Sequence, residues 1–375
     1  MRTLKVLAVL TCLSLFLPGR LEAAEMRGLW VDAFHPGFKS AEETSAMVAK
    51  AKDCNFNALF VQVRKRGDVY YESAIEPKAN DVDAAYDPLA DVITKAHAAG
   101  LEVHAWISVY EVYHDTKWND PHSQQVHLKR PDWLMKDYLG RTTFYGEKLF
   151  LDPGVPEVQA YLVSIVDELV KDYAVDGIHL DIARYPGREA GYNSASIARF
   201  NLDAGRTGKP ESEDETWCTW RRAQVTSFVQ SAYQKATSIK PAVKVSAAVF
   251  ANRTSAFHQH FQDWEGWLKA GILDFAVPMV FPKDNQVFQK SAAEVAAVPT
   301  NGRHIYLGQG GYRLGAAQGV EQISMARQAG FGGIVVYSYH YCARPQPNQS
   351  SSMMDALKAG LFAEADTVPV MSWKQ

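Results

Sequence analysis

Polar residues interrupt an apolar stretch at residues 176–186, where the sequence reads DGIHLDIARYP. Alternate side chains of a strand share one face, so His179 and Asp181 lie opposite the apolar residues between them. A carboxylate at a strand end can act as nucleophile, base or stabiliser of an oxocarbenium-like transition state. We therefore predict Asp181 as the central catalytic residue; the alternative is a buried aspartate paired with Arg184 for structure alone. Its predicted substrate-binding neighbours are His179, Arg184 and Tyr185.

Glycoside hydrolysis usually needs a second carboxyl group, about 5 Å from the first for retention or about 6.5–9.5 Å for inversion. Glu111 and Asp284 each follow a predicted strand, and we predict them as the catalytic partners, ahead of Asp32. Acidic residues in loops more often only solubilise the surface, so the sequence does not decide between these candidates.

Strand alternation predicts further residues that bind substrate. Polar side chains on a barrel strand are not expected to face the surrounding helices. Arg64 in this set could donate hydrogen bonds to sugar hydroxyls or lower the pKa of a neighbouring carboxyl group, whereas His104 could equally be a core residue. The candidates are Asp32, Gln62, Arg64, His104, Trp106, Phe281 and Tyr337.

Short apolar runs alternate with longer amphipathic runs from Met26 onward, a pattern of strand, crossover helix and parallel strand. Eight such strands predict a (β/α)₈ TIM barrel in a single domain. The predicted strands are residues 27–34, 58–63, 101–108, 177–181, 243–250, 273–281, 304–308 and 332–338.

Two connections, residues 109–151 after strand 3 and 182–213 after strand 4, are too long for plain strand-to-helix loops. Both leave the carboxyl ends of strands, where barrels hold their active sites, so these insertions are predicted cleft walls. Ser40 is a predicted helix N-cap, and Gly100 and Gly271 are predicted helix ends.

The first residues resemble a secretory signal peptide. Arg2 and Lys5 precede an apolar run at residues 6–17, which is shorter than the roughly 20 residues that span a bilayer. We predict a signal peptide at 1–23, a barrel at 24–365 and a C-terminal tail at 366–375. The expected location is the periplasm or the exterior. There are two weaker alternatives: an uncleaved N-terminal anchor, and a lipid attached at Cys12.

The net charge of −3 excludes a strongly basic protein, so we expect no nucleic-acid partner and no stable membrane insertion after cleavage. Cysteines are few, and no Cys/His cluster has metal-ligand spacing, so we expect no metal and no cofactor. Cys54, Cys218 and Cys342 allow at most one disulfide. We expect a monomer that binds a polysaccharide or other glycan.

Several stretches together resemble the glycosyl hydrolase-like 10 domain family. The most specific is the Asp176–Pro186 motif, and the others run in order from about residue 26 to about 345. They include Arg27-Gly28-Leu29-Trp30-Val31, Gln62-Val63-Arg64-Lys65-Arg66-Gly67-Asp68, His104-Ala105-Trp106-Ile107, Leu151-Asp152-Pro153-Gly154, Trp220-Arg221-Arg222 and Asp274-Phe275-Ala276-Val277-Pro278-Met279.

The resemblance implies an exported bacterial TIM-barrel glycosidase, from a family with members that cleave the glycan strands of peptidoglycan. Two positions depart from the family. Ile182 and Ala183 follow Asp181 where many members carry another acidic or aromatic residue, and Met279 stands where many have glutamine. A mechanism with two adjacent aspartates is therefore not expected.

We predict an exported glycoside hydrolase that acts by carboxylate acid/base chemistry, with peptidoglycan glycan strands as the first expected substrate. A non-catalytic carbohydrate-binding barrel is the alternative. A metal-dependent hydrolase would need His104, His179 and His340 to converge, and the first strand lacks the H-x-H pair common in such barrels.

Overall fold

The computed structural model describes residues 24–114, 125–142 and 148–374. The predicted signal peptide at 1–23 lies outside these residues, as do 115–124, 143–147 and Gln375.

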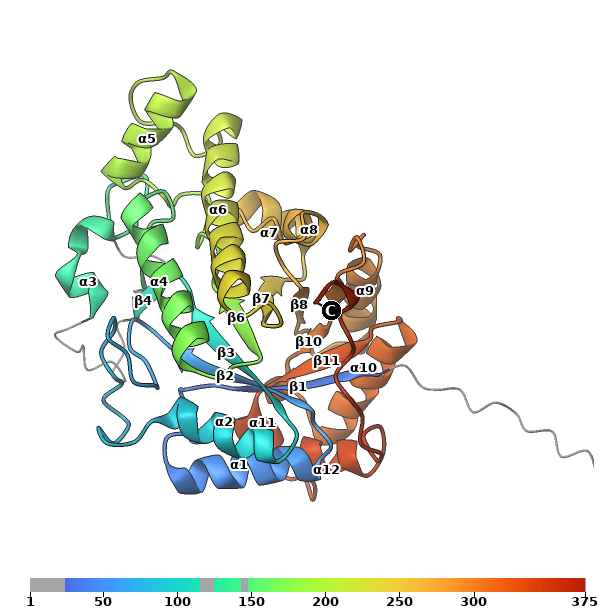
Figure 1. Ribbon diagram of the computed structural model, residues 1–375. Coiled ribbons are helices and arrows are strands. Elements are labelled where there is room, and N and C mark those ends of the chain that lie inside the picture. The colour runs from blue at the N-terminus through green and yellow to red at the C-terminus, as the bar shows by residue number, and fades with distance from the viewer. Residues whose placement is uncertain (1–23, 115–124, 143–147, 375) are drawn as a thin grey trace, which may run out of the picture.

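Parallel strands close into a barrel, as predicted (Figure 1). The strands pair in the order β10-β11-β1-β2-β3-β6-β7-β8, and β10 pairs with β8 to close the cylinder. The predicted strand at 304–308 is divided into β9 and β10 at Tyr306. The barrel strands are β1 (Met26–Val31), β2 (Ala58–Arg64), β3 (Glu102–Ser108), β6 (Gly177–Asp181), β7 (Lys244–Phe250), β8 (Phe275–Val280), β9 (His304–Ile305), β10 (Leu307–Gln309) and β11 (Gly333–Tyr337).

Helices surround the barrel and cover its outer face (Figure 1). Ser40 accepts a hydrogen bond from the Glu43 N–H and so caps α1, and Gly100 and Gly271 have positive φ angles of 73° and 70° after helices, as expected. The longer helices are α1 (Ala41–Asp53), α2 (Pro88–Ala98), α4 (Pro156–Asp172), α6 (Glu215–Ile239), α9 (Asn285–Ala296) and α10 (Ala316–Gln328). The shorter ones are α7 (Arg253–Gln259), α8 (Trp264–Lys269), α11 (Tyr339–Cys342) and α12 (Met353–Lys358).

Both predicted insertions contain secondary structure of their own. The first holds β4 (Glu111–His114), which pairs antiparallel with β5 (Lys148–Phe150), and α3 (Val126–Lys129). The second holds α5 (Ser194–Ala204), which stands away from the barrel beside the first turns of α6 (Figure 1). Because β4 begins three residues after β3 ends, the first insertion rises directly from the barrel mouth.

The barrel interior is filled mainly by aromatic side chains, and the aliphatic core lies between strands and helices. His104 stacks on Phe60 with ring centroids 4.5 Å apart, and both are fully buried. A Cβ at Gly177 would overlap the His104 ring, so glycine is required where the neighbouring strand passes this histidine. No described helix has the length and apolarity that a bilayer crossing requires.

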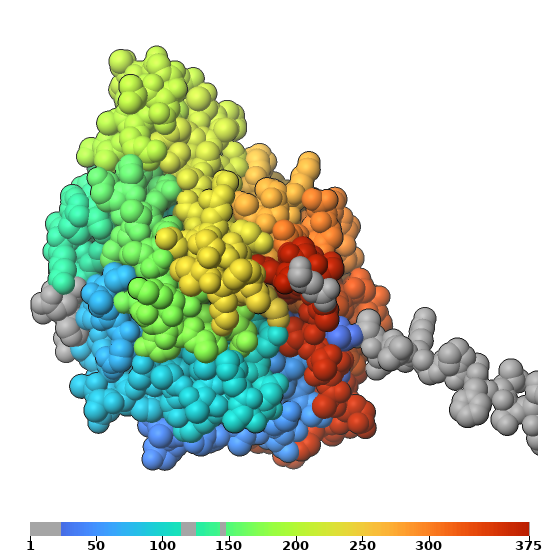
Figure 2. All heavy atoms as spheres, viewed as in Figure 1, coloured from blue at the N-terminus to red at the C-terminus, as the bar shows by residue number. Residues whose placement is uncertain are grey.

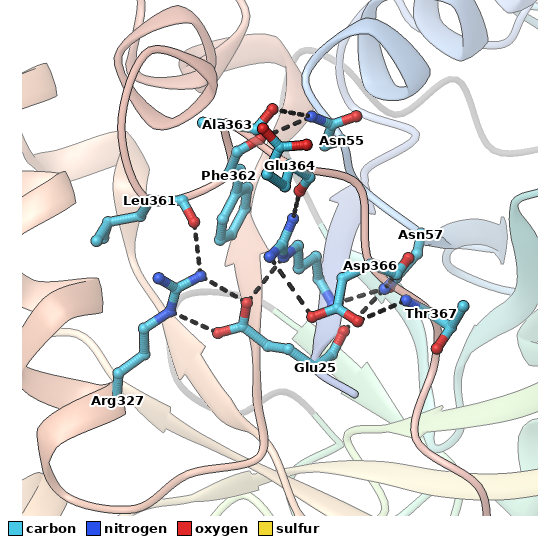
Figure 3. A network of polar contacts seen from close by, with 11 residues as sticks. Glu25, Asn55, Asn57, Arg327, Leu361, Phe362, Ala363, Glu364, Asp366 and Thr367 are labelled. Carbon is cyan, nitrogen blue, oxygen red and sulfur yellow. Dashed lines mark hydrogen bonds and ion pairs between the residues drawn. The ribbon is translucent and has the colours of Figure 1, made fainter. Parts of the chain in front are cut away.

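The amino-terminal end of the barrel is closed by an ion-pair network that joins the two ends of the described chain (Figure 3). The Glu25 carboxylate accepts hydrogen bonds from Arg27 and from Arg327 of α10. Arg27 also pairs with Asp366 at 3.5 Å. The C-terminal segment is thereby tied to the first strand.

Residues 366–374, predicted as a tail, pack under the barrel, and Figure 2 shows this end of the chain lying against the end of α6. Met371 is buried with the barrel aromatics. The Trp373 indole N–H donates to the buried Asp274 carboxylate at 2.7 Å, and Lys374 pairs with the same carboxylate at 2.9 Å. The segment therefore supplies two of the partners that Asp274 needs.

We expect Trp373→Ala to lower the free energy of unfolding by about 2 kcal/mol, since it removes a packed ring and one hydrogen bond to a buried carboxylate. Trp373→Phe keeps the ring and loses only the hydrogen bond, so it should lose about half as much. Urea denaturation measures both. Equal midpoints for Trp373→Ala and the parent protein would contradict this role.

Candidate active site

A cavity of about 380 Å³ opens where the barrel strands end at their carboxyl termini. Its lining residues come from β1, β2, β3, β6, β7, β8 and β11 and from the loops after them. Parallel strands present the ends of many elements to one face of a barrel, which is why side chains far apart in sequence meet here. The cavity therefore lies where a barrel enzyme places its chemistry.

Asp181 is the last residue of β6 and lines this cavity. Its carboxylate accepts a hydrogen bond from the Trp106 indole N–H at 3.1 Å and another from the Ile182 backbone N–H at 2.8 Å. Burial raises the pKa of Asp181, and the negative charge of Glu111 raises it further, while Arg184 and the two hydrogen bonds oppose that rise. A carboxyl group whose pKa is raised is suited to donate a proton.

Glu111 is the first residue of β4 and lines the same cavity. The antiparallel pairing of β4 with β5 places Glu111 opposite Phe150 and brings Lys148 beside it. The Glu111 carboxylate is nearly buried and pairs with Arg66 at 3.2 Å and with Lys148 at 3.1 Å. The Glu111 carboxylate is therefore held between two cationic side chains from different elements. The cavity thus holds two carboxyl groups in unlike surroundings.

Gln62 lines the cavity and connects three strand ends. Its carbonyl oxygen accepts from the Ala33 N–H at 3.0 Å, and its amide donates to the Ser108 hydroxyl at 3.2 Å. Asp32 lies beside this network and is 3% exposed. Its carboxylate accepts from the Ser338 hydroxyl and contacts the His35 ring nitrogen, each at 2.7 Å. Asp32 therefore ties β1 to the end of β11 outside the lining of the cavity.

Aromatic rings form much of the remaining wall. Trp30, Trp106, Phe281 and Tyr337 all line the cavity and meet one another edge to face or tilted, with centroids 6.0–6.5 Å apart. Flat apolar faces of this kind can pack against the C–H face of a sugar ring. Of the aromatic residues predicted to bind substrate, Trp106, Phe281 and Tyr337 line the cavity, whereas Tyr185 does not.

The His179 side chain holds a cavity residue in place from inside the barrel. Its Nε2 accepts a hydrogen bond from the Trp30 indole N–H at 3.1 Å, so the ring proton resides on Nδ1 and is donated to Ser246 Oγ at 2.8 Å. Burial lowers the pKa of His179 well below its usual value, and the nearby His104 adds to this effect. His179 is thus a neutral positioning residue and does not line the cavity.

Four other predicted residues lie away from the cavity. Asp284 is the exposed N-cap of α9 and accepts from two backbone N–H groups there. Arg64 is fully buried and pairs with Glu76, while His104 is a core residue stacked on Phe60. Tyr185 is fully buried, and its ring packs edge to face against Phe261.

The cavity also contains residues that the sequence did not predict as site residues. Lys65 and Arg66 line the cavity and follow directly after β2. They belong to a run of three basic residues, and the sequence does not indicate which of the three faces a ligand. Lys148 reaches the cavity only because β5 pairs with β4. Tyr312, in the turn after β10, is a further lining residue that the sequence did not predict.

The three histidines that a metal site would need are engaged elsewhere. His104 stacks on Phe60, His179 bridges Trp30 and Ser246, and His340 stacks on His35. Within 24–114, 125–142 and 148–374, no three His, Cys, Asp or Glu side chains are grouped so that they could hold a metal ion. Cys54, Cys218 and Cys342 are free and buried.

Two other hollows in the described part of the chain are larger but do not bring free carboxyl groups together. One of them, of about 650 Å³, lies beside α7 and α8. Its Asp263 caps α8 and its Glu265 pairs with Arg253, so both are already used in local structure. We therefore assign the candidate site to the smaller cavity at the barrel mouth.

Arg184 lines the cavity and affects His260 behind it. The His260 ring and the Arg184 guanidinium both pack on Phe250, at 4.4 Å and 4.6 Å. Burial, followed by the charge of Arg184, lowers the pKa of His260 from 6.5 to about 4. The folded protein therefore keeps this ring neutral at pH values where the unfolded chain protonates it.

We expect the free energy of unfolding to fall as the pH is lowered from about 6.5 to about 4. In this range the unfolded chain binds a proton at His260 and the folded chain does not, so protonation favours unfolding. His260→Gln removes this contribution and should make the fall less steep over that range, while the buried His179 still contributes to it. Denaturant midpoints measured at a series of pH values compare the two proteins. Parallel curves would contradict the assignment.

Comparisons with known proteins agree with this architecture. The family model described as Glycosyl hydrolase-like 10 matches residues 25–325. Glycosyl hydrolase YngK of Bacillus subtilis (strain 168) is 25% identical over 396 residues, which cover 93% of this chain and 74% of that protein. Glycosyl hydrolase DigH of Escherichia coli (strain K12) is 26% identical over 401 residues, which cover 88% of this chain and 87% of that protein.

Solved structures support the fold. The PgaB (BpsB) glycoside hydrolase domain from Bordetella bronchiseptica superimposes with a TM-score of 0.67 at 14% identity and covers 89% of this chain and 98% of its own. The catalytic domain of a beta-amylase from Paenibacillus polymyxa gives 0.63 at 14% identity, covering 92% and 100%. Both similarities concern the barrel and not the residues of the site.

Proposed function

Because the chain belongs to the glycosyl hydrolase-like 10 family, we propose that it hydrolyses glycosidic bonds, with Asp181 and Glu111 as its two catalytic carboxyl groups. One observation carries the proposal: both groups line one cavity at the barrel mouth, and their charges interact. Two carboxyl groups with unlike surroundings are what acid-assisted hydrolysis of a glycoside requires.

The surroundings divide the two roles. Asp181, whose pKa is raised, protonates the glycosidic oxygen as the bond to the anomeric carbon breaks. Glu111, whose carboxylate pairs with Arg66 and Lys148, acts on the anomeric carbon either directly as a nucleophile or as the base that activates a water molecule. Trp106 donates a hydrogen bond to Asp181 and so fixes the direction of its carboxyl group.

The substrate that we propose is the glycan strand of peptidoglycan, reached after export and removal of residues 1–23. The charged start, the short apolar run and the small residues before Ala24 support export. The aromatic wall supports a ligand made of sugar rings, since such rings present apolar faces between their hydroxyl groups.

The test incubates the purified protein with peptide-free peptidoglycan strands and a panel of neutral polysaccharides and measures new reducing ends. Glu111→Gln should retain about one hundredth of the activity on the cleaved glycan. Asp284→Asn is the matched control, because it makes the same carboxyl-to-amide change at an exposed helix cap where Asn serves equally well.

The outcomes separate the alternatives. Reducing ends from the parent protein, with loss in Glu111→Gln and retention in Asp284→Asn, would support the proposal. Binding of glycan without any new reducing ends would favour the non-catalytic carbohydrate-binding barrel. Loss in Asp284→Asn, with full activity in Glu111→Gln, would overturn the assignment of the second carboxyl group.

A further inference from the structure

The cavity carries an excess of positive charge in a protein whose net charge is −3. Four cationic side chains line it, against the two carboxyl groups of the proposed reaction. The cations come from three separate parts of the chain, after β2, from β5 and after β6. They are Lys65, Arg66, Lys148 and Arg184. Cations therefore outnumber carboxylates among the lining residues, and Asp68, outside the lining, pairs with Lys65 at 3.6 Å.

The cations are held in place before any ligand arrives. Arg66 and Lys148 converge on Glu111 from different elements. The Lys65 ammonium and the Arg66 guanidinium lie over the Phe34 ring, 5.9 Å and 4.8 Å from its centroid. Side chains that are already held in position lose little conformational freedom on binding. The entropic cost of ordering them therefore reduces the binding affinity less.

Phe34 gives this cationic rim a place for a sugar ring. It lines the cavity and is 44% exposed, so part of its ring is open to a ligand. A sugar ring stacked on the free part of Phe34 would lie close to Lys65 and Arg66. An acidic substituent of that sugar would then meet two fixed donors.

The chemistry of this rim selects the charge of the ligand. Lysine and arginine only donate hydrogen bonds, whereas neutral sugar hydroxyls both donate and accept. A carboxylate accepts several charge-assisted hydrogen bonds, which are stronger than neutral ones. A sugar with a free amino group would be repelled by the same cations. The rim therefore fits an anionic sugar better than a neutral or cationic one.

We propose that Lys65, Arg66 and Lys148 form a subsite for a carboxylate-bearing sugar, so that the substrate is an acidic glycan. This inference rests on the proposed function, because it assigns the substrate class of the same cavity. The carboxylate belongs either to a uronic acid or to the ether side chain of a muramic acid, and the experiment distinguishes these two sources.

The experiment uses the full chain and two pairs of glycans. One pair is peptide-free peptidoglycan strands, with free carboxyl groups or with those groups chemically reduced to alcohols. The other pair is a polyuronate and its carboxyl-reduced form. Tryptophan fluorescence measures equilibrium binding, because Trp30 and Trp106 line the cavity, and reducing ends are measured in parallel.

We expect the carboxylated member of one pair to bind about tenfold more tightly at low salt, with a preference that shrinks as salt is added. The pair that shows the preference identifies the source of the carboxylate. Lys148→Gln and Lys65→Gln should each reduce the preference to about twofold. Lys358→Gln removes an equal charge from a distant surface pair with Asp53 and should leave the preference unchanged.

Two results would overturn the subsite. One is equal binding of both members of each pair, or no binding of either carboxylated glycan. The other is a full preference retained in both lysine variants. Equal cleavage of carboxylated and reduced glycans would reject the subsite but leave the proposed hydrolysis standing. A carboxylate preference in binding without any new reducing ends would reject hydrolysis and leave the subsite standing.

Discussion

Asp181→Asn is expected to lower kcat/KM on the cleaved glycan by about 10³-fold, because an amide cannot supply the proton that the leaving oxygen needs. Asparagine has nearly the same size, and its single carbonyl oxygen can keep one of the two hydrogen bonds that Trp106 and Ile182 donate to different oxygens of the Asp181 carboxylate. The substitution therefore changes the chemistry while leaving the cavity in place. Initial rates of reducing-end release over a range of substrate concentrations measure the loss.

The same variant should lose little stability at neutral pH, because the removed cost of ionising Asp181 offsets the one hydrogen bond that the amide cannot accept. A carboxyl group whose pKa is raised in the fold is costly when ionised, and this cost is present above its folded pKa and disappears as the pH falls through that value. Removing the group removes the cost. A large loss of stability at pH 7, together with unchanged activity of the folded fraction, would show that Asp181 is only a structural aspartate.

Arg64→Met is expected to lower the free energy of unfolding by about 3–5 kcal/mol, because it leaves the Glu76 carboxylate buried without its cation. The two side chains are 0% and 1% exposed and are joined by a two-pronged contact, with both hydrogen bonds at 2.7 Å. Arg64 also donates to the Val109 carbonyl at the start of the first insertion. Denaturant unfolding measures the effect.

A second variant tests whether the cost comes from the unpaired charge. Arg64→Met combined with Glu76→Leu removes both charges and should recover much of the stability that the single variant loses. Substrate KM in the folded fraction should change little in either variant, since Arg64 does not line the cavity. A large rise in KM with unchanged stability would instead restore the sugar-binding role that the sequence suggested.

The difference between Arg64 and its neighbours shows what strand alternation cannot decide. Gln62 and Arg64 share a face of β2, and the pattern predicted both as ligand-binding residues. The register shifts between them where β2 pairs with β3, so Gln62 opens onto the cavity while Arg64 turns back into a buried pair with Glu76. Strand alternation predicts the face of the strand on which a side chain lies. A local shift in strand register then decides which neighbouring residues that side chain contacts.

The second carboxyl group shows the same limit. Glu111 and Asp284 both follow barrel strands and were equivalent by sequence position. Asp284 is used to cap α9, and Glu111 is carried over the cavity by the pairing of β4 with β5. That pairing brings Lys148 to Glu111, 37 residues earlier in the chain, so no local pattern predicts the contact.

The sequence by itself determined the barrel, its eight strand positions and the place of Asp181 at a strand end, because these depend on periodicities within short segments. Only the tertiary structure decided which polar residues share the cavity, since that depends on how the inserted segments fold over the barrel mouth. Lys148 and Arg66 meet at Glu111 for this reason, and His104 and Arg64 do not reach the cavity. Contacts between distant segments depend on the packing of the whole chain, so patterns within short segments of the sequence do not predict them.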